Sequence, residues 1–279
     1  MAQREALLQG FWSKLNRLLM KNPIGIFDSG VGGTSIWKEI RRALPSETTI
    51  YLADSKNAPY GDKSQEEILQ LSIKNTELLL KMGCKLIVVA CNTATTNSID
   101  YLRSFYDIPF IGIEPAIKPA ALQSISKTIG VLATKGTLSS SLFHSTSEIH
   151  ANGIKIVEQE GKGLVQLIEA GQVSSEEMTT LLKRYLEPMH DAGIDHLVLG
   201  CTHYPYLIPV LKELLHAHVK IIDSGEAVAR QTKAVLDKTQ RTNTSKINGK
   251  SIFYTNAELG VLKQFLKGSV VDEVTYLDF

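Results

Sequence analysis

Residues 85–94 read Lys-Leu-Ile-Val-Val-Ala-Cys-Asn-Thr-Ala, an apolar run that changes abruptly to cysteine, asparagine and threonine. Residues 196–205, His-Leu-Val-Leu-Gly-Cys-Thr-His-Tyr-Pro, have the same form. Short apolar runs that alternate with helical patterns are typical of parallel α/β sheets, whose active sites lie at the carboxyl ends of the strands. The two stretches therefore predict an α/β fold in which Cys91 and Cys201 each follow a strand.

The two stretches are part of a longer internal repeat. A capping-box pattern predicts the start of a helix at Ser64 and another at Ser174. Each helix is expected to end near a glycine, Gly83 or Gly193. The serines, the glycines and the two cysteines are all separated by the same number of positions, and a shared offset indicates a duplication. We therefore predict two similar lobes, each a mainly parallel sheet flanked by helices, related by pseudo-twofold symmetry with the active site in the cleft between them.

Other apolar runs complete the predicted sheets. The full set is IGIF (24–27), TIYLA (49–53), KLIVVA (85–90), FIGI (110–113), TIGVLA (128–133), HLVLG (196–200) and VKIID (219–223). The chain is expected to leave the first lobe near residue 112 and to return near residue 222. Residues 23–112 plus 222–279 would then form the first lobe and residues 113–221 the second. Residues 1–22 predict a separate amphipathic helix, because their leucines recur at helical spacing.

The composition excludes several classes of protein. The 279 residues are 43% hydrophobic, as in globular chains, and no run reaches the roughly 20 apolar residues of a membrane span. Thirty Lys and Arg against 29 Asp and Glu give a net charge of +1, so we expect neither nucleic acid nor a membrane as a partner. Three cysteines without a CxxC motif predict free thiols in the cytoplasm, with no disulfide framework and no metal site.

Two identical side chains on opposite sides of a cleft suit a reaction that inverts the configuration of a carbon acid. One thiolate removes a proton from one face of the substrate, and the other thiol returns a proton to the opposite face. The reference pKa of a thiol, about 8.5, makes both forms accessible, and a helix N-terminus stabilises the thiolate. The two sulfurs are then expected about 6–7 Å apart, too far for a disulfide. Cys84, between a helix end and a strand, is instead expected to be a buried structural thiol.

Several motifs together resemble those of a known family. They are Asp28-Ser-Gly-Val-Gly-Gly33, Ala58-Pro-Tyr-Gly-Asp62, Ala90-Cys-Asn-Thr-Ala94, Gly112-Ile-Glu-Pro115, Gly200-Cys-Thr-His-Tyr-Pro205 and the FYTNAEL stretch that begins at Phe253. Over residues 24–279 the chain resembles the glutamate racemases of the cofactor-independent aspartate/glutamate racemase superfamily. The resemblance implies interconversion of L- and D-glutamate without a cofactor, supply of D-glutamate for peptidoglycan biosynthesis, and a homodimer.

The resemblance also implies roles for individual residues. Cys91 is expected to act on D-glutamate with help from Asp28, and Cys201 on L-glutamate with help from His203. Glu169 is expected to support catalysis, although its segment, residues 161–169, lacks a cysteine and two prolines that are usual in the family. Substrate binding is implied for Asp28, Ser29, Tyr60, Gly61, Asn92, Thr93, Thr134, Thr202 and His203. Apart from Asp28 and His203, these are neutral groups, and neutral donors can hold both carboxylates of glutamate without a cationic clamp.

Other interpretations of the sequence make different predictions. The chain could be another amino-acid racemase of the same superfamily, or a single-cysteine isomerase or decarboxylase in which one thiol is dispensable. It could also be a non-catalytic amino-acid-binding regulator, which would bind without proton exchange. Two cysteines in otherwise intact motifs favour the racemase.

Overall fold

The computed structural model describes residues 20–279, so the helix expected over residues 1–22 lies almost wholly outside the described residues. Over residues 20–279 the strands are β1 (Ile24–Asp28), β2 (Thr49–Ala53), β3 (Leu86–Val89), β4 (Phe110–Gly112), β5 (Thr128–Ala133), β6 (Lys155–Glu160), β7 (His196–Gly200), β8 (Lys220–Ile222), β9 (Ser251–Thr255) and β10 (Glu273–Tyr276). They form two sheets, ordered β10-β9-β2-β1-β3-β4 and β6-β5-β7-β8, in which neighbouring strands are parallel.

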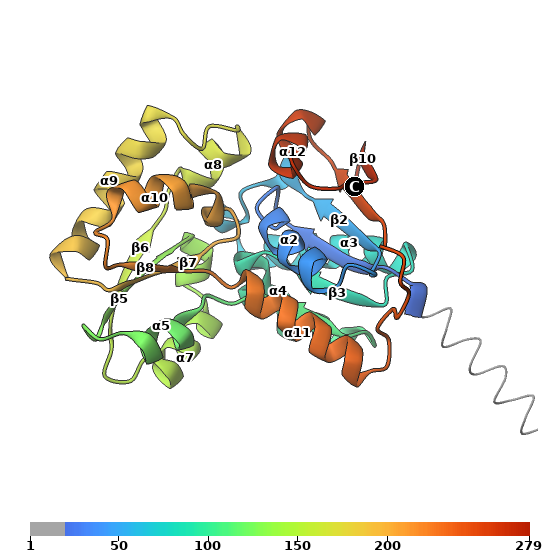
Figure 1. Ribbon diagram of the computed structural model, residues 1–279, viewed down its shortest axis with the longest axis horizontal. Coiled ribbons are helices and arrows are strands. Elements are labelled where there is room, and N and C mark those ends of the chain that lie inside the picture. The colour runs from blue at the N-terminus through green and yellow to red at the C-terminus, as the bar shows by residue number, and fades with distance from the viewer. Residues whose placement is uncertain (1–19) are drawn as a thin grey trace, which may run out of the picture.

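Helices cover the faces of both sheets, and the two lobes lie side by side (Figure 1). The helices are α2 (Thr34–Ala43), α3 (Gln65–Lys81), α4 (Asn92–Phe105), α5 (Ile117–Gln123), α6 (Lys135–Leu138), α7 (Ser141–His150), α8 (Leu164–Glu169), α9 (Glu176–Asp191), α10 (Ile208–Leu214), α11 (Gly225–Lys238) and α12 (Leu259–Leu266). The predicted α/β fold with two mainly parallel sheets is confirmed.

The strand order repeats between the two lobes. In each sheet the first strand lies between the second and the third, with the fourth beyond the third, giving β2-β1-β3-β4 and β6-β5-β7-β8. The equivalent strands β3 and β7 both lead into a cysteine, so the duplication predicted from the sequence is present in the topology. The first sheet draws on residues 24–112 and 251–276 and the second on residues 128–222. The lobe boundaries at residues 112 and 222 stay a prediction.

Three strands were not predicted, namely β6, β9 and β10. Two of them, β6 and β10, are edge strands whose residues are half-buried or exposed. Charged and polar residues break up the apolar runs of these two strands, KIVEQE and EVTY, whereas the other edge strands, β4 and β8, have runs that were recognised. In β9 buried and half-buried residues alternate, and its apolar run, Ile252-Phe-Tyr254, is only three residues long.

The start of α3 agrees with the prediction and the start of α9 does not. Ser64 forms the predicted capping box with Glu67. The prediction of a cap at Ser174 is wrong, because Ser175 caps α9 by accepting a hydrogen bond from Met178 N–H at 3.1 Å. Helix α9 is thus one residue shorter than α3. The capping serines are therefore separated by one position more than the glycines and the cysteines are.

Both helices end in the same way. Gly83 and Gly193 have φ values of +78° and +69°, in the left-handed region that favours glycine. Each is followed by a residue that closes a Schellman motif, with Cys84 N–H bonding to Leu79 and Ile194 N–H to Met189. These glycines therefore stop the helices and turn the chain into the strands that precede the cysteines.

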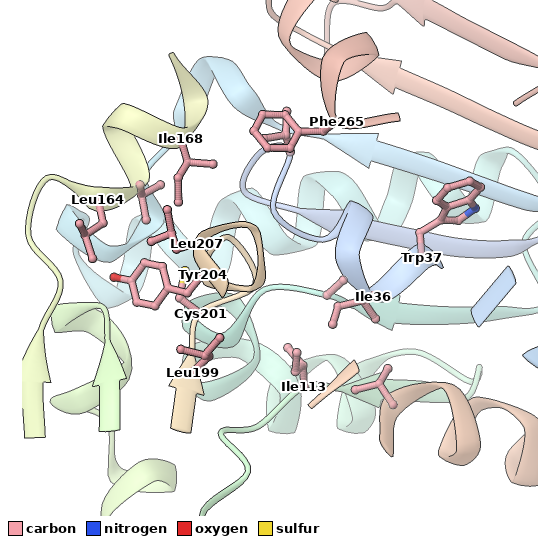
Figure 2. Close-up of a cluster of buried hydrophobic side chains, with 14 of the residues drawn as sticks. Ile36, Trp37, Ile113, Leu164, Ile168, Leu199, Cys201, Tyr204, Leu207 and Phe265 are labelled. Atoms are coloured by element: carbon pink, nitrogen blue, oxygen red, sulfur yellow. The ribbon is translucent and has the colours of Figure 1, made fainter. Parts of the chain in front are cut away.

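A buried hydrophobic cluster crosses from one lobe to the other (Figure 2). It joins Ile36 and Trp37 of α2 and Ile113 beyond β4 with Leu164, Ile168, Leu199, Cys201, Tyr204 and Leu207 of the second lobe. One continuous apolar core thus holds the lobes together and places Cys201 in surroundings that exclude water. None of the helices described over residues 20–279 has the length and apolar character that a bilayer crossing requires.

We predict that Gly83→Ala and Gly193→Ala each lower the free energy of unfolding by about 1–2 kcal/mol. An added Cβ would meet no atom within 4 Å at either position, so the cost comes from the backbone conformation alone. Urea titration measures it as a lower midpoint with an unchanged slope. Gly260→Ala in α12, also in open space but without a positive φ, is the control and is expected to leave the midpoint unchanged or raise it. A loss at Gly260 equal to that at Gly83 would contradict the prediction.

Candidate active site

A small cavity lies between the two lobes, and its lining includes residues that follow β1, β3, β5 and β7. It is nearly closed, with a volume of about 10 Å³, and is lined by Ser29, Pro59, Tyr60, Gly61, Cys91, Asn92, Thr93, Thr134, Val165, Cys201, Thr202 and His203. Every predicted site residue except Asp28 and Glu169 is in this lining, whereas Val165 was not predicted. Residues of both lobes thus enclose one small, nearly closed space.

Cys91 sits at the point where β3 turns into α4. It is the N-cap of that helix, and its Sγ accepts a hydrogen bond from Ala94 N–H at 3.4 Å. The thiol donates to Ser29 Oγ at 3.6 Å. Burial and then the nearby Asp28 carboxylate raise the pKa of Cys91, and the bonds from Ala94 and to Ser29 lower it only in part. The helix N-terminus does contact the sulfur as expected, but burial outweighs it and favours the neutral thiol.

Cys201 follows β7 and faces a histidine. Its Sγ lies 3.7 Å from His203 Nδ1, and His203 Nε2 lies 2.5 Å from Glu169 Oε1. Burial acts to lower the pKa of His203, but the hydrogen bonds to Cys201 and Glu169 outweigh it and raise this pKa well above its usual range. The imidazole therefore lies between a sulfur and a carboxylate, and the Gly32 N–H also lies 3.3 Å from its Nε2.

Glu169, the last residue of α8, connects the two lobes. Its Oε1 accepts a hydrogen bond from Val31 N–H at 2.7 Å and its Oε2 accepts one from Ser55 Oγ at 3.0 Å. Both donors belong to the first lobe, whereas Glu169 and His203 belong to the second. The changed sequence of residues 161–169 has therefore not removed Glu169 from the site.

Two glycines of the Asp28-Ser-Gly-Val-Gly-Gly33 motif allow this close approach. A Cβ at Gly30 would lie 1.9 Å from Glu169 Oε1, and a Cβ at Gly32 would lie 2.3 Å from His203 Nδ1. Both distances are far shorter than van der Waals contact. The motif is thus glycine-rich because side chains of the opposite lobe pack directly on its backbone.

Asp28, at the end of β1, lies behind the cavity wall. Its Oδ1 accepts from Gly30 N–H and its Oδ2 from Thr202 Oγ1, both at 2.9 Å. Burial raises the pKa of Asp28 to about 6, despite the opposing effects of His203 and the Thr202 hydrogen bond. A carboxyl group with this pKa can both hold and release a proton near neutral pH.

Threonines from both lobes meet on the Cys91 side of the cavity. Thr93 Oγ1 lies 2.8 Å from Thr134 Oγ1, which lies 3.1 Å from Thr137 Oγ1. Thr137 was not predicted, although it stands three residues after Thr134 on the short helix that Thr134 caps. Asn92 is buried nearby, and over residues 20–279 its Oδ1 has no hydrogen-bond partner. Hydroxyl and amide groups thus converge on one side of the cavity.

Tyr60 lines the cavity, but its hydroxyl is bonded to residues that do not. The hydroxyl donates to Asp54 Oδ2 at 2.5 Å and accepts from Asn75 Nδ2 at 3.1 Å. Cys84 is buried in the first lobe, as expected, and burial raises its pKa to about 12.

We predict that Asp28 makes the stability of the protein depend on pH. Its pKa is about 6 in the folded protein against 3.8 normally, so its contribution to stability is complete below pH 3.8 and is lost as the pH rises through 6. At about 1.4 kcal/mol per pKa unit, the difference in unfolding free energy between wild type and Asp28→Asn should change by roughly 2–3 kcal/mol between pH 4 and pH 7. Urea titrations at the two pH values measure this change. The same difference at both pH values would contradict the prediction.

Comparison with known proteins agrees with this geometry. A family model described as Asp/Glu/Hydantoin racemase matches residues 24–232. A glutamate racemase from Herpetosiphon aurantiacus is 44% identical over 236 residues, which cover 85% of this chain and 93% of that protein. Figure 1 shows the two-lobed arrangement that similar solved structures share.

Two of these structures contain glutamate. The glutamate racemase of Francisella tularensis, in complex with D-glutamate, has a TM-score of 0.80 and 30% identity, covering 92% of this chain and 98% of that one. The Escherichia coli glutamate racemase, in complex with L-glutamate and the activator UDP-MurNAc-ala, has a TM-score of 0.79 and 34% identity with the same coverage. The chain described here therefore belongs to the Asp/Glu/hydantoin racemase family and, within it, to the glutamate racemases.

Proposed function

We propose that this protein interconverts L- and D-glutamate by a two-base mechanism in which Cys91 and Cys201 act on opposite faces of the α-carbon. The observation that carries the proposal is that both thiols line one small cavity, each delivered by the equivalent strand of a different lobe. Related enzymes in complex with D-glutamate and with L-glutamate support glutamate as the substrate.

The two thiols exchange roles between the two directions of the reaction, and in the L-to-D direction Cys201 is the base and Cys91 the acid. His203, whose pKa is raised by its hydrogen bonds to Cys201 and Glu169, can hold a proton beside Cys201, whereas burial favours the thiol form of Cys91. The Cys201 thiolate takes the α-proton of L-glutamate, so that the C–H bond breaks and an S–H bond forms. Cys91 then gives its proton to the other face of the carbanion and becomes the thiolate. In the reverse reaction Cys91 is the base, and Asp28, with a pKa of about 6, is the nearby group that can take up or supply a proton.

The cavity suits a carbanion that carries two carboxylates. No Lys or Arg is among the residues that line it, so hydroxyl, amide and backbone N–H groups are the donors for the carboxylates. Asn92 Oδ1, buried and without a partner over residues 20–279, is an acceptor suited to the ammonium group. Fixed donors in a cavity that excludes water stabilise developing charge far better than mobile solvent does.

The cellular role follows from the product. D-Glutamate is a building block of peptidoglycan, so the proposed role is its supply for cell-wall synthesis in the cytoplasm. The homodimer stays a prediction.

We predict that Cys91→Ala and Cys201→Ala each lower the rate of racemisation at least about 100-fold, because each removes the acid or base on one face. Exchange of the α-proton with solvent D₂O, followed by NMR, separates the two roles. Cys201→Ala should still exchange D-glutamate, from which Cys91 removes the proton, and should not exchange L-glutamate. Cys91→Ala should show the opposite preference.

The buried Cys84→Ala variant is the matched control and should keep both racemisation and exchange. Full racemisation by either active-site variant would show that one thiol is dispensable and would contradict the two-base mechanism. Binding of glutamate by the wild-type protein without any exchange would instead favour a non-catalytic regulator.

A further inference from the structure

Asp54 is a buried carboxylate that the mechanism does not use. It follows β2, and its side chain is fully enclosed. Its Oδ1 accepts hydrogen bonds from Asn57 Nδ2 at 2.7 Å and Asn256 Nδ2 at 2.5 Å, and its Oδ2 accepts from Tyr60 Oη at 2.5 Å and Lys74 Nζ at 3.2 Å. Burial of a carboxylate is costly unless it is paired and hydrogen-bonded, and Asp54 has both kinds of partner.

The partners of Asp54 lead directly to the substrate cavity. Asn57 and Tyr60 belong to the loop that follows it, and this loop supplies Pro59, Tyr60 and Gly61 to the cavity lining. Ser55, at the start of the loop, donates to Glu169. The backbone N–H of Asp54 also donates to the carbonyl of Asp28 at 3.1 Å. The Asp54 carboxylate thus holds the loop at Asn57 and Tyr60, and the start of the loop is also bonded to Glu169 and Asp28.

Asn256 links the FYTNAEL motif to this loop, although no residue of the motif lines the cavity. Its Oδ1 accepts from Lys56 N–H at 2.9 Å, and its Nδ2 donates to Asp54 and to the main-chain oxygen of Phe279 at 3.2 Å. Lys74 Nζ also donates to that oxygen of Phe279 at 3.2 Å. Both groups of the Asn256 amide are therefore used to join β9 to the loop and its buried carboxylate.

We propose that Asp54 and Asn256 are positioning residues for glutamate, which act through Tyr60 by holding the Pro59–Gly61 wall of the cavity in place. The proposal rests on the racemase function given above. Neither residue lines the cavity. A cavity wall that is not held in place must become ordered each time substrate binds. Replacement of either residue should therefore raise KM more than it lowers kcat.

The test uses the full chain and glutamate, with Asp54→Asn, Asn256→Ala, Tyr60→Phe and the double variant Asp54→Asn/Tyr60→Phe. Asp54→Asn keeps the side-chain size but places an amide where five donors converge, since Asn75 Nδ2 also donates to Oδ2 at 3.4 Å. It should raise KM for both enantiomers about tenfold, with a smaller fall in kcat, and Asn256→Ala should change KM in the same direction. If Asp54 acts through Tyr60, the double variant should be no worse than Asp54→Asn alone, because coupled residues are not additive. Glu77→Gln, on α3 but bonded to Tyr106, is the control and should change neither constant.

The outcomes separate this inference from the proposed function. A wild-type protein that does not racemise glutamate would overturn the function. An active wild type whose Asp54 and Asn256 variants unfold at lower urea concentration but keep KM would show that the two residues only stabilise the fold. If the fold-changes in KM of the two single variants multiply in the double variant, Asp54 does not act through Tyr60. If Asp54→Asn fails to fold, an unchanged KM in Asn256→Ala overturns the proposal by itself.

Discussion

The candidate site depends on the contact that Glu169 makes across the two lobes. Its carboxylate accepts hydrogen bonds from Val31 and Ser55 of one lobe while it holds His203 of the other. Through His203 the same contact fixes the surroundings of Cys201. It also explains Gly30 and Gly32, since no larger residue would let the carboxylate and the imidazole lie so close to the backbone.

The neighbours of the two thiols make the two halves of the site different. Cys91 is enclosed near the carboxylate of Asp28, and both effects favour its neutral form. Cys201 is enclosed as well, but beside a histidine whose pKa is raised. The duplicated fold therefore supplies two equivalent thiols in different surroundings, a carboxylate near Cys91 and a histidine beside Cys201. Electrostatic effects of this size are possible because the apolar core continues up to Cys201 (Figure 2) and excludes water from it.

The sequence predicts those parts of the molecule that depend on local patterns. Central strands such as β3 and β7 are buried on both faces, so they appear as continuous apolar runs, and their ends locate both cysteines. The edge strands β6 and β10 have no such run. The cap of α9 was misplaced by one residue because Ser174 and Ser175 are adjacent and both precede acidic residues. Asp54, Thr137 and Val165 were missed because they come close to the site only through tertiary contacts. No motif in the sequence indicates those contacts.

The placement of two bases on opposite faces can be tested in the wild-type protein. L-Glutamate is converted in D₂O, the reaction is stopped when only a small fraction of D-glutamate has formed, and the α-deuterium content of each enantiomer is measured by mass spectrometry after chiral separation. With two bases, the D-glutamate should carry deuterium from the first turnover, while the remaining L-glutamate keeps its protium. Deuterium that enters both enantiomers equally, or D-glutamate that retains the original protium, would show that a single base serves both faces.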